Sequence, residues 1–351
     1  MIKLEKFVRN AKLRSPLLNF DVQEQEIEYR KDPLLEMWVR INVERASRKK
    51  QVSEEIDVIE VIKSTQKGCF FCPGNLEKST PKFFGIEEDG EEIERIKIGN
   101  SCIFPNLFPF GKNHAVGIFS GDHFLRIGDF SPKLIKDCIS ACLKYFQKVH
   151  EKQKDARYPL FSWNHMPPSG ASIIHPHVQI LIEEKPTFLL SKYMEKSRSF
   201  YERNKRNFWN LLLEKEKKIG ERFIGENDSL AVLTSFAPQG NNEVLILFKE
   251  GISSLNQLND RGIKEFAQAI SSILKAYQSL GVQSFTLSTY SGPIDEDISH
   301  YFNLNAKIIS RPNFQKYYTN DTGFMERLNL EWVVLSKPEE IASFMRDEIH
   351  L

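Results

Sequence analysis

Two histidines one residue apart, followed by a glutamine, are the residues of this sequence best suited to chemistry. They occur in the stretch His175-Pro176-His177-Val178-Gln179, which apolar residues flank on both sides. Such flanks predict a strand, on which every second side chain projects from the same face. We therefore expect His175, His177 and Gln179 to stand in a row on one surface. Pro176 has no N–H to donate to a sheet, which predicts an edge strand or a strand end.

Two imidazoles and an amide in a row can hold a phosphate group. An imidazole nitrogen can also act as a nucleophile toward phosphorus. The same pattern would arise if the histidines bound a structural metal, or if two of the 8 histidines fell together by chance. The motif alone does not separate these alternatives, so the rest of the sequence must decide between them.

A second motif is the C-x-x-C pair of Cys69 and Cys72, which Pro73 and Gly74 follow directly. A turn of this kind is a common half of a zinc site. The competing interpretation is a redox C-x-x-C, but such a motif usually opens a helix, and we expect Pro73 and Gly74 to prevent one. Zinc is therefore the favoured interpretation.

Composition excludes several classes of function. The chain has 351 residues, 41% hydrophobic and 27% charged, which is typical of a soluble globular protein with room for two domains. A net charge of +1 gives no support for binding nucleic acid or a membrane. The sequence has no run apolar enough for a transmembrane helix and no signal-peptide core at its start, so we expect a cytoplasmic protein. Five cysteines make no disulfide framework, and Cys102, Cys138 and Cys142 are expected to be core residues.

The order of elements in the first half recurs in the second. The first half is expected to contain extended runs at 101–104 and 115–119, a helix from about residue 132, a run at 160–163 and then the histidine strand. The second half is expected to contain a hairpin of runs at 230–236 and 243–248, a helix with apolar positions from 263 to 277, a run at 284–289 and a strand at 301–310. The sequence therefore predicts an α+β fold built by internal duplication, with antiparallel sheets and packed helices.

The duplication sets the expected domain boundaries. An N-terminal domain covers residues 1–188, a charged helical connector covers 189–228, and a C-terminal domain covers 229–351. In the register of the repeat, His175 falls on Asn305 and His177 on Lys307. Only the first copy would then keep the histidines, so we expect one functional site per chain, in the first copy.

These motifs, in this order, resemble the galactose-1-phosphate uridylyltransferase family, a branch of the histidine-triad superfamily. The resemblance covers nearly the whole chain. Besides the histidine strand and the C-x-x-C turn, it rests on Arg45 and Arg48 after Trp38, on Pro105-Asn106-Leu107-Phe108-Pro109, on Ser120-Gly121-Asp122-His123, and on Asn164 followed by Ser169-Gly170-Ala171-Ser172. It implies two tandem histidine-triad-like domains and a homodimer with shared active sites.

The resemblance also implies a role for each site residue. Cys69, Cys72, His123 and His175 would bind one structural Zn²⁺ per chain, with His114 as the rival of His123. His177 would be the nucleophile that attacks the α-phosphorus of a nucleotide sugar, with Gln179 and Ser172 as its catalytic partners. The expected substrate contacts are Arg45, Arg48 and Asn164 for the phosphates, and Asn106 and Phe108 for the nucleoside. Some members of the family hold a second metal, which we do not expect here because Asn305 and Lys307 replace the histidines.

The function implied is transfer of a nucleoside monophosphate, UMP by default, from a nucleotide sugar to a hexose 1-phosphate, as in galactose metabolism. The main alternative is a phosphorylase that uses inorganic phosphate on ADP-glucose-like or dinucleoside polyphosphate substrates. A nucleotide hydrolase and an inert zinc-stabilised binding protein are further alternatives. Two departures bear on the sugar and the nucleotide. Phe324 stands where the family has a hexose-contacting tyrosine, and His165-Met166-Pro167-Pro168 stands where it usually has a small residue or glycine.

Overall fold

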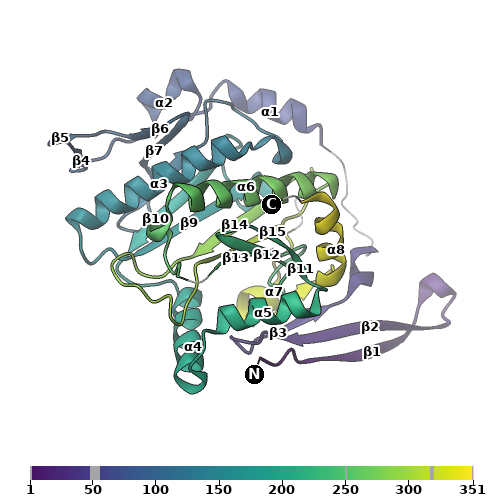
Figure 1. The fold of residues 1–351 in the computed structure, drawn as a ribbon. Coiled ribbons are helices and arrows are strands. Elements are labelled where there is room, and N and C mark those ends of the chain that lie inside the picture. Colours follow the sequence, from purple (N-terminus) through teal and green to yellow (C-terminus); the bar gives the residue numbers. More distant parts are fainter. Residues whose placement is uncertain (1, 48–55, 250, 317–319, 350) are drawn as a thin grey trace.

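One ten-stranded antiparallel sheet runs through both halves of the chain (Figure 1). The computed structural model describes residues 2–47, 56–249, 251–316, 320–349 and 351. The first half supplies β6 (Ile96–Ile98), β7 (Ser101–Pro105), β8 (His114–Ile118), β9 (Tyr158–His165) and β10 (His177–Glu183). The second half supplies β11 (Phe223–Glu226), β12 (Leu230–Leu233), β13 (Val244–Phe248), β14 (Phe285–Tyr290) and β15 (Asn305–Ser310). From the central pair outward, the order is β9-β10-β8-β7-β6 on one side and β14-β15-β13-β12-β11 on the other, so the halves mirror each other.

Two long helices, α3 (Pro132–Lys152) and α6 (Asp260–Ser279), lie side by side on one face of this sheet (Figure 1). Ser131 caps α3 and Asn259 caps α6, each by accepting a backbone N–H of the first turn. The apolar residues that the helical spacing selected in the sequence are buried, as predicted; in α3 these are Ile135, Ile139, Cys142, Phe146 and Val149. Helix α3 packs on strands of the first half and α6 on β12 of the second half, and the buried residues of both helices belong to one continuous core.

The opposite face of the sheet is covered differently in the two halves. In the second half, α4 (Phe188–Asn204) and α5 (Phe208–Ile219) lie against it and bury a second cluster that includes Leu245, Tyr193 and Trp209. In the first half, a smaller cluster around Phe71 and Phe104 covers only part of the same face. Leu76 of α2 (Pro73–Ser79) packs against this smaller cluster, and α1 (Val58–Gln66) precedes α2 in the chain. The small hairpin of β4 (Glu87–Glu88) and β5 (Glu91–Glu92) lies beside α3, whose Lys144 and Lys152 pair with Glu88 and Glu87.

A second sheet of four strands carries the N-terminal hairpin, which projects from the body (Figure 1). It consists of β1 (Lys6–Arg14), β2 (Val22–Lys31), β3 (Trp38–Ile41) and β16 (Trp332–Val334), followed by α8 (Pro338–Glu348); α7 (Phe324–Leu328) precedes β16. Arg30 of β2 is only 1% exposed and makes a bidentate contact with Glu339 of α8 at 2.8 and 2.9 Å. The buried Arg222 also donates to Glu339, so one carboxylate ties the hairpin to the body.

The predicted class, antiparallel sheets with packed helices, is confirmed. Two details of the sequence-based expectation were wrong. His175 lies before β10 rather than on it, because Pro176 interrupts the ladder and the strand begins at His177. The equivalent strand β15 begins at Asn305, so His177 corresponds to Asn305 and not to Lys307. Among the described residues, no helix is long and apolar enough to cross a membrane.

Replacing Glu339 by Gln should destabilise the fold. Burial opposes ionisation of Glu339, but the hydrogen bond and charge of Arg30, helped by Arg222, outweigh it and lower the pKa of Glu339 to about 2. Because 27% of this side chain stays exposed, we expect a loss of about 1–3 kcal/mol in the free energy of unfolding, less than for a fully buried pair. Urea denaturation near neutral pH measures it.

The matched control is Glu340→Gln, which removes an exposed charge from the same helical turn. The contribution of Glu339 is complete above its ordinary pKa of 4.5 and is lost as the pH falls toward 2, so the difference between the wild-type and Glu339→Gln chains should shrink in acid. Equal losses in the two variants at neutral pH would contradict this account.

Candidate metal centre and active site

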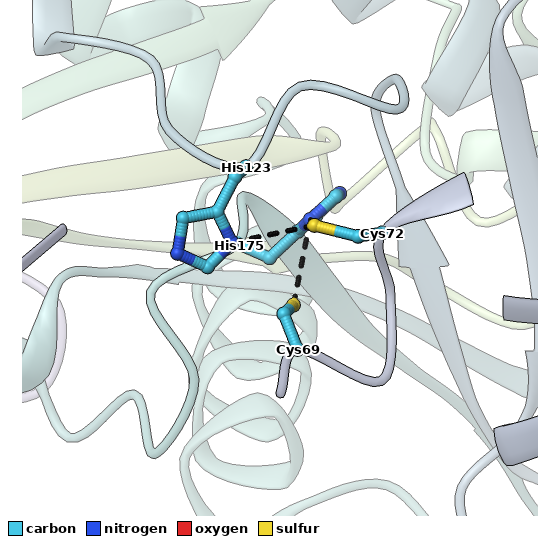
Figure 2. A group of neighbouring side chains, drawn as sticks. All are labelled: Cys69, Cys72, His123 and His175. Carbon is cyan, nitrogen blue, oxygen red and sulfur yellow. Dashed lines mark hydrogen bonds between the residues drawn. The ribbon is translucent and has the colours of Figure 1, made fainter. Parts of the chain in front are cut away.

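Two cysteines and two histidines meet beside the first half of the large sheet. Figure 2 shows Cys69, Cys72, His123 and His175 converging from three separate segments. Their ligand atoms all lie within 4.8 Å of one another. The sulfur of Cys72 lies 3.5 Å from Nδ1 of His123 and 3.8 Å from Nδ1 of His175, and the sulfur of Cys69 lies 3.7 Å from the latter nitrogen. Zinc bonds of about 2.0–2.3 Å would place ligand atoms of a tetrahedron about 3.3–3.8 Å apart, so this donor set fits Zn²⁺.

Hydrogen bonds orient both histidine rings of this cluster. Nε2 of His175 donates to the carbonyl oxygen of Ser120 at 2.9 Å. Nε2 of His123 lies 3.0 Å from Oγ1 of Thr65 on α1, and that hydroxyl already donates to a carbonyl of its own helix. Both Nε2 atoms therefore carry the proton, which leaves the Nδ1 lone pairs directed at the sulfurs, as metal ligation requires.

The expectation that Pro73 prevents a helix after the C-x-x-C turn was wrong. Cys72 is the N-cap of α2, and Pro73 occupies the first helical position, where its missing N–H costs nothing. A redox interpretation still does not follow. Burial, followed by the nearby Cys69 thiol, raises the pKa of Cys72 to about 11, whereas a reactive C-x-x-C needs a lowered thiol pKa.

His177, which opens β10, is held by the backbone of the cluster. Its Nδ1 lies 2.8 Å from the carbonyl oxygen of His175. A carbonyl only accepts, so Nδ1 carries the proton and Nε2 keeps its lone pair. Burial lowers the pKa of His177, which favours the neutral ring. Phe71 packs edge-on against the same ring, with centroids 5.5 Å apart. An imidazole fixed in this tautomer is a competent nitrogen nucleophile.

The His177 ring lines a cavity of about 400 Å³. Of the residues predicted from the sequence, Ser172, Gln179, Asn106 and Phe108 line it too. Phe108 is 82% exposed and Phe70 is 57% exposed at this cavity, so two aromatic faces are free to stack on a planar ring. None of the described residues that line the cavity is a lysine or an arginine.

Three residues predicted to contact the substrate are not among the described residues that line the His177 cavity. Asn164, on β9, accepts a hydrogen bond from Thr286 at 3.0 Å and does not line the cavity. Arg45 lines a second cavity of about 410 Å³, together with Phe324 and Glu326. Arg48 lies outside the described residues. Within one chain, the described part therefore brings together the predicted nucleophile His177 and the predicted nucleoside contacts Asn106 and Phe108, but not Arg45.

The loop that carries Ser172 contains a strained residue. Met166 has φ of 68° and ψ of 155°, a conformation that glycine adopts easily and other residues rarely. The carbonyl oxygen of Met166 accepts hydrogen bonds from Ser169 Oγ at 2.7 Å and from Ser169 N at 3.0 Å. These bonds hold the loop in the shape that glycine would allow without strain, although the sequence has methionine there.

Sequence reasoning missed three contributors to the site. Phe70 and Phe71 stand inside the C-x-x-C motif, but nothing in their type indicated that they line the cavity. Thr65 had no signal, because its role depends on how α1 packs. His114 was considered only as a zinc ligand; the structure places it away from the sulfurs, with Nε2 3.1 Å from Oε1 of Gln179.

Removing one sulfur of the cluster should lower zinc content and stability together. Cys69→Ser leaves three of four ligands, so we expect bound zinc well below about one equivalent and a thermal midpoint lower by several degrees. Metal analysis and thermal unfolding, with and without a chelator, measure both. Cys138→Ala is the matched control, since this cysteine is buried in α3 away from the cluster. A Cys69→Ser chain with full zinc and unchanged stability would rule out the zinc site.

Known proteins that are similar in sequence to this chain include members of the family that its motifs resemble. No family model matches this chain. A protein of Archaeoglobus fulgidus, named only as an uncharacterized protein, is 29% identical over 343 residues, or 97% of this chain and 98% of that protein. The galactose-1-phosphate uridylyltransferase of Thermotoga maritima is 22% identical over 290 residues, or 80% of this chain and 86% of that protein.

Solved structures share the fold. An ADP-glucose phosphorylase from Arabidopsis thaliana, with bound ADP-glucose, has a TM-score of 0.71 at 19% identity and covers 93% of this chain and 100% of its own. A uridylyltransferase has a TM-score of 0.66 at 20% identity and covers 91% of this chain and 97% of its own. In sequence and in fold, this chain therefore resembles the galactose-1-phosphate uridylyltransferase family, as its motifs predict.

Proposed function

We propose that this protein transfers a nucleoside monophosphate, UMP by default, from a nucleotide sugar to a hexose 1-phosphate through a covalent nucleotidyl-His177. The similarity to a uridylyltransferase and to an ADP-glucose phosphorylase supports an enzyme of the nucleotidyltransferase and phosphorylase group, without specifying the substrate. The single observation that carries the proposal is the His177 ring at a cavity of about 400 Å³: its Nδ1 bonds to a backbone carbonyl, and its Nε2 has no hydrogen-bond partner among the described residues.

The proposed reaction has two displacements at the same phosphorus. In the first, the Nε2 lone pair of His177 attacks the α-phosphorus, a P–N bond forms, and the P–O bond to the departing sugar phosphate breaks. In the second, a phosphate oxygen of the acceptor attacks the same phosphorus and the P–N bond breaks, which restores His177. Gln179 and Ser172 would donate hydrogen bonds to the phosphate oxygens as charge develops on them.

A zinc ion held by Cys69, Cys72, His123 and His175 would be structural, because four protein ligands leave no open position. The ion would fix the loop before β10. Through the His175 carbonyl it would also fix the ring of His177, so the protein residues themselves perform the proposed steps.

Transfer of a charged phosphate group needs a positively charged side chain nearby, and a partner subunit could supply it. The described lining of the His177 cavity has no arginine or lysine, whereas Arg45 faces a separate cavity beside Phe324 and Glu326. We propose that Arg45 and Arg48 of one subunit bind the substrate phosphates at the His177 cavity of its partner. The hexose would bind near Phe324. Asn164 stays a proposed phosphate contact.

The mirrored strand order supports an origin by internal duplication. On this proposal, residues 1–188 and 229–351 are the two histidine-triad-like domains and 189–228 connects them. They share one sheet, so the boundaries mark repeated units rather than separately packed bodies.

Mutation of the nucleophile tests the proposal. A His177→Gly chain should form no covalent nucleotidyl adduct, because His177 is the only histidine among the described residues that line the cavity, while its zinc content and fold persist. Mass spectrometry of chains mixed with UDP-glucose or ADP-glucose, followed by peptide mapping, measures the adduct. Adduct formation at the wild-type rate in His177→Gly would refute the assignment. Turnover with inorganic phosphate but not with hexose 1-phosphate would favour the phosphorylase alternative.

Mixed dimers test whether the sites are shared. His177→Gly and Arg45→Ala chains should each be inactive or nearly so. After subunit exchange, activity should return to roughly a quarter of the wild-type value, because half of the dimers are mixed and each has one intact site. The same chains assayed before exchange are the control. Two inactive variants that recover nothing as verified mixed dimers would show that each subunit builds its own site.

A further inference from the structure

His114 is a buried imidazole that the proposed reaction does not use. It opens β8, is 4% exposed, and packs against the ring of Phe110 with centroids 4.1 Å apart. Both of its ring nitrogens have partners. Nδ1 lies 3.3 Å from the backbone N of Phe110, and Nε2 lies 3.1 Å from Oε1 of Gln179. The ring therefore bridges the loop after β7 and the strand that carries the nucleophile.

The partners of the ring fix its tautomer. The backbone N–H of Phe110 can only donate, so Nδ1 of His114 must accept and carries no proton. In the neutral ring the proton is then on Nε2, which donates to Gln179 Oε1. A doubly protonated ring would direct two N–H groups at each other on the Nδ1 side. Burial, which lowers the pKa of His114, also favours the neutral form.

A second neighbour limits the alternatives. Nδ2 of Asn106 lies 3.1 Å from the same Nε2, while Oδ1 of Asn106 accepts from the backbone N of Phe108 at 2.9 Å. The amide of Asn106 is therefore anchored through its oxygen, and its N–H groups cannot accept the His114 proton. Oε1 of Gln179 is the acceptor that remains for it among the described contacts of Nε2.

We infer that His114 is a positioning residue that sets the amide of Gln179, with its oxygen on His114 and its NH₂ group facing the phosphate position in the cavity. This inference rests on the proposed function. Gln179 and His177 are two residues apart on β10 and line the same cavity, so the side chain of Gln179 lies on the same side of the strand as the His177 ring. The reverse orientation would direct a carbonyl oxygen at a phosphate oxygen, which is repulsive.

The geometry of the sheet explains why position 114 can do this. In the antiparallel pair, Leu181 lies opposite His114 and Gln179 lies opposite Val116. His114 and Gln179 are therefore diagonal neighbours on one face, within reach of long or aromatic side chains. The cavity lining offers no lysine or arginine within the described chain, so the direction of each amide donor carries more weight there.

A double-mutant cycle on nucleotidyl labelling tests the role in catalysis. His114→Leu should slow single-turnover labelling of His177 by about 10- to 100-fold, since the donor of Gln179 is misplaced rather than removed. Gln179→Ala should lose more, and His114→Leu should cost nothing further in the Gln179→Ala background. His114→Gln, which can offer an N–H at a similar reach, should recover part of the rate. Zinc content and thermal midpoint serve as controls for the fold.

The ring nitrogens provide a readout that needs no substrate. Nuclear magnetic resonance of isotope-labelled histidine should show His114 protonated on Nε2 and unprotonated on Nδ1, and Gln179→Ala should shift the Nε2 signal. The opposite tautomer, or independent and additive effects of the two substitutions on labelling, would overturn the inference. If the wild-type chain forms no adduct with any nucleotide, the proposed function fails, and the tautomer measurement still decides the contact between His114 and Gln179.

Discussion

A single hydrogen bond, from Nδ1 of His177 to the carbonyl oxygen of His175, joins the cysteine–histidine cluster to the His177 ring and its cavity. It lies within one tripeptide, so the side chain of His175 can join the cysteines while its carbonyl selects the tautomer of His177. Pro176 makes this possible, because it keeps His175 off the strand. Whatever fixes the ring of His175, a metal ion above all, then also fixes the direction of the Nε2 lone pair of His177.

The second half of the sheet has the same type of hydrogen bond, from a side chain to the backbone carbonyl two residues earlier, but the residue there is not a histidine. Asn305 opens β15 as His177 opens β10, and its Nδ2 donates to the carbonyl oxygen of Asn303 at 3.0 Å. There the equivalent face is buried beneath α4 and α5, and Lys307 pairs with Glu243 at 3.2 Å under that cover. An asparagine has no nucleophilic ring nitrogen, and Asn305 is fully buried. The two halves therefore differ physically: His177 lines a cavity, whereas the equivalent face of the second half is covered by α4 and α5.

The periodicity of apolar residues predicted the helices and strands well, because the buried positions in this fold repeat at helical or strand spacing. Helix α3 and its buried positions, and the placement of His177 and Gln179 on one strand, follow from periodicities that a sequence displays directly. The metal cluster needed more, since Cys69, Cys72, His123 and His175 come together only through the resemblance or the fold. The start of α2 after Cys72 was missed because proline is compatible with a first helical turn. The contact between His114 and Gln179 depends on cross-strand register, and Thr65 on the packing of α1; neither has a signature in one sequence.

The measurement that tests the central claim most directly is the intact mass of the wild-type protein after separate incubations with UDP-glucose, UDP-galactose, ADP-glucose and a diadenosine polyphosphate. The account predicts a mass gain of one nucleoside monophosphate with at least one of these donors, stable in base and lost in acid, as expected for a phosphorus–nitrogen bond to histidine. The donor that labels the chain would identify the base. Zinc-loaded protein that turns over one of these donors without ever carrying the adduct, even when quenched within a single turnover, would contradict the account.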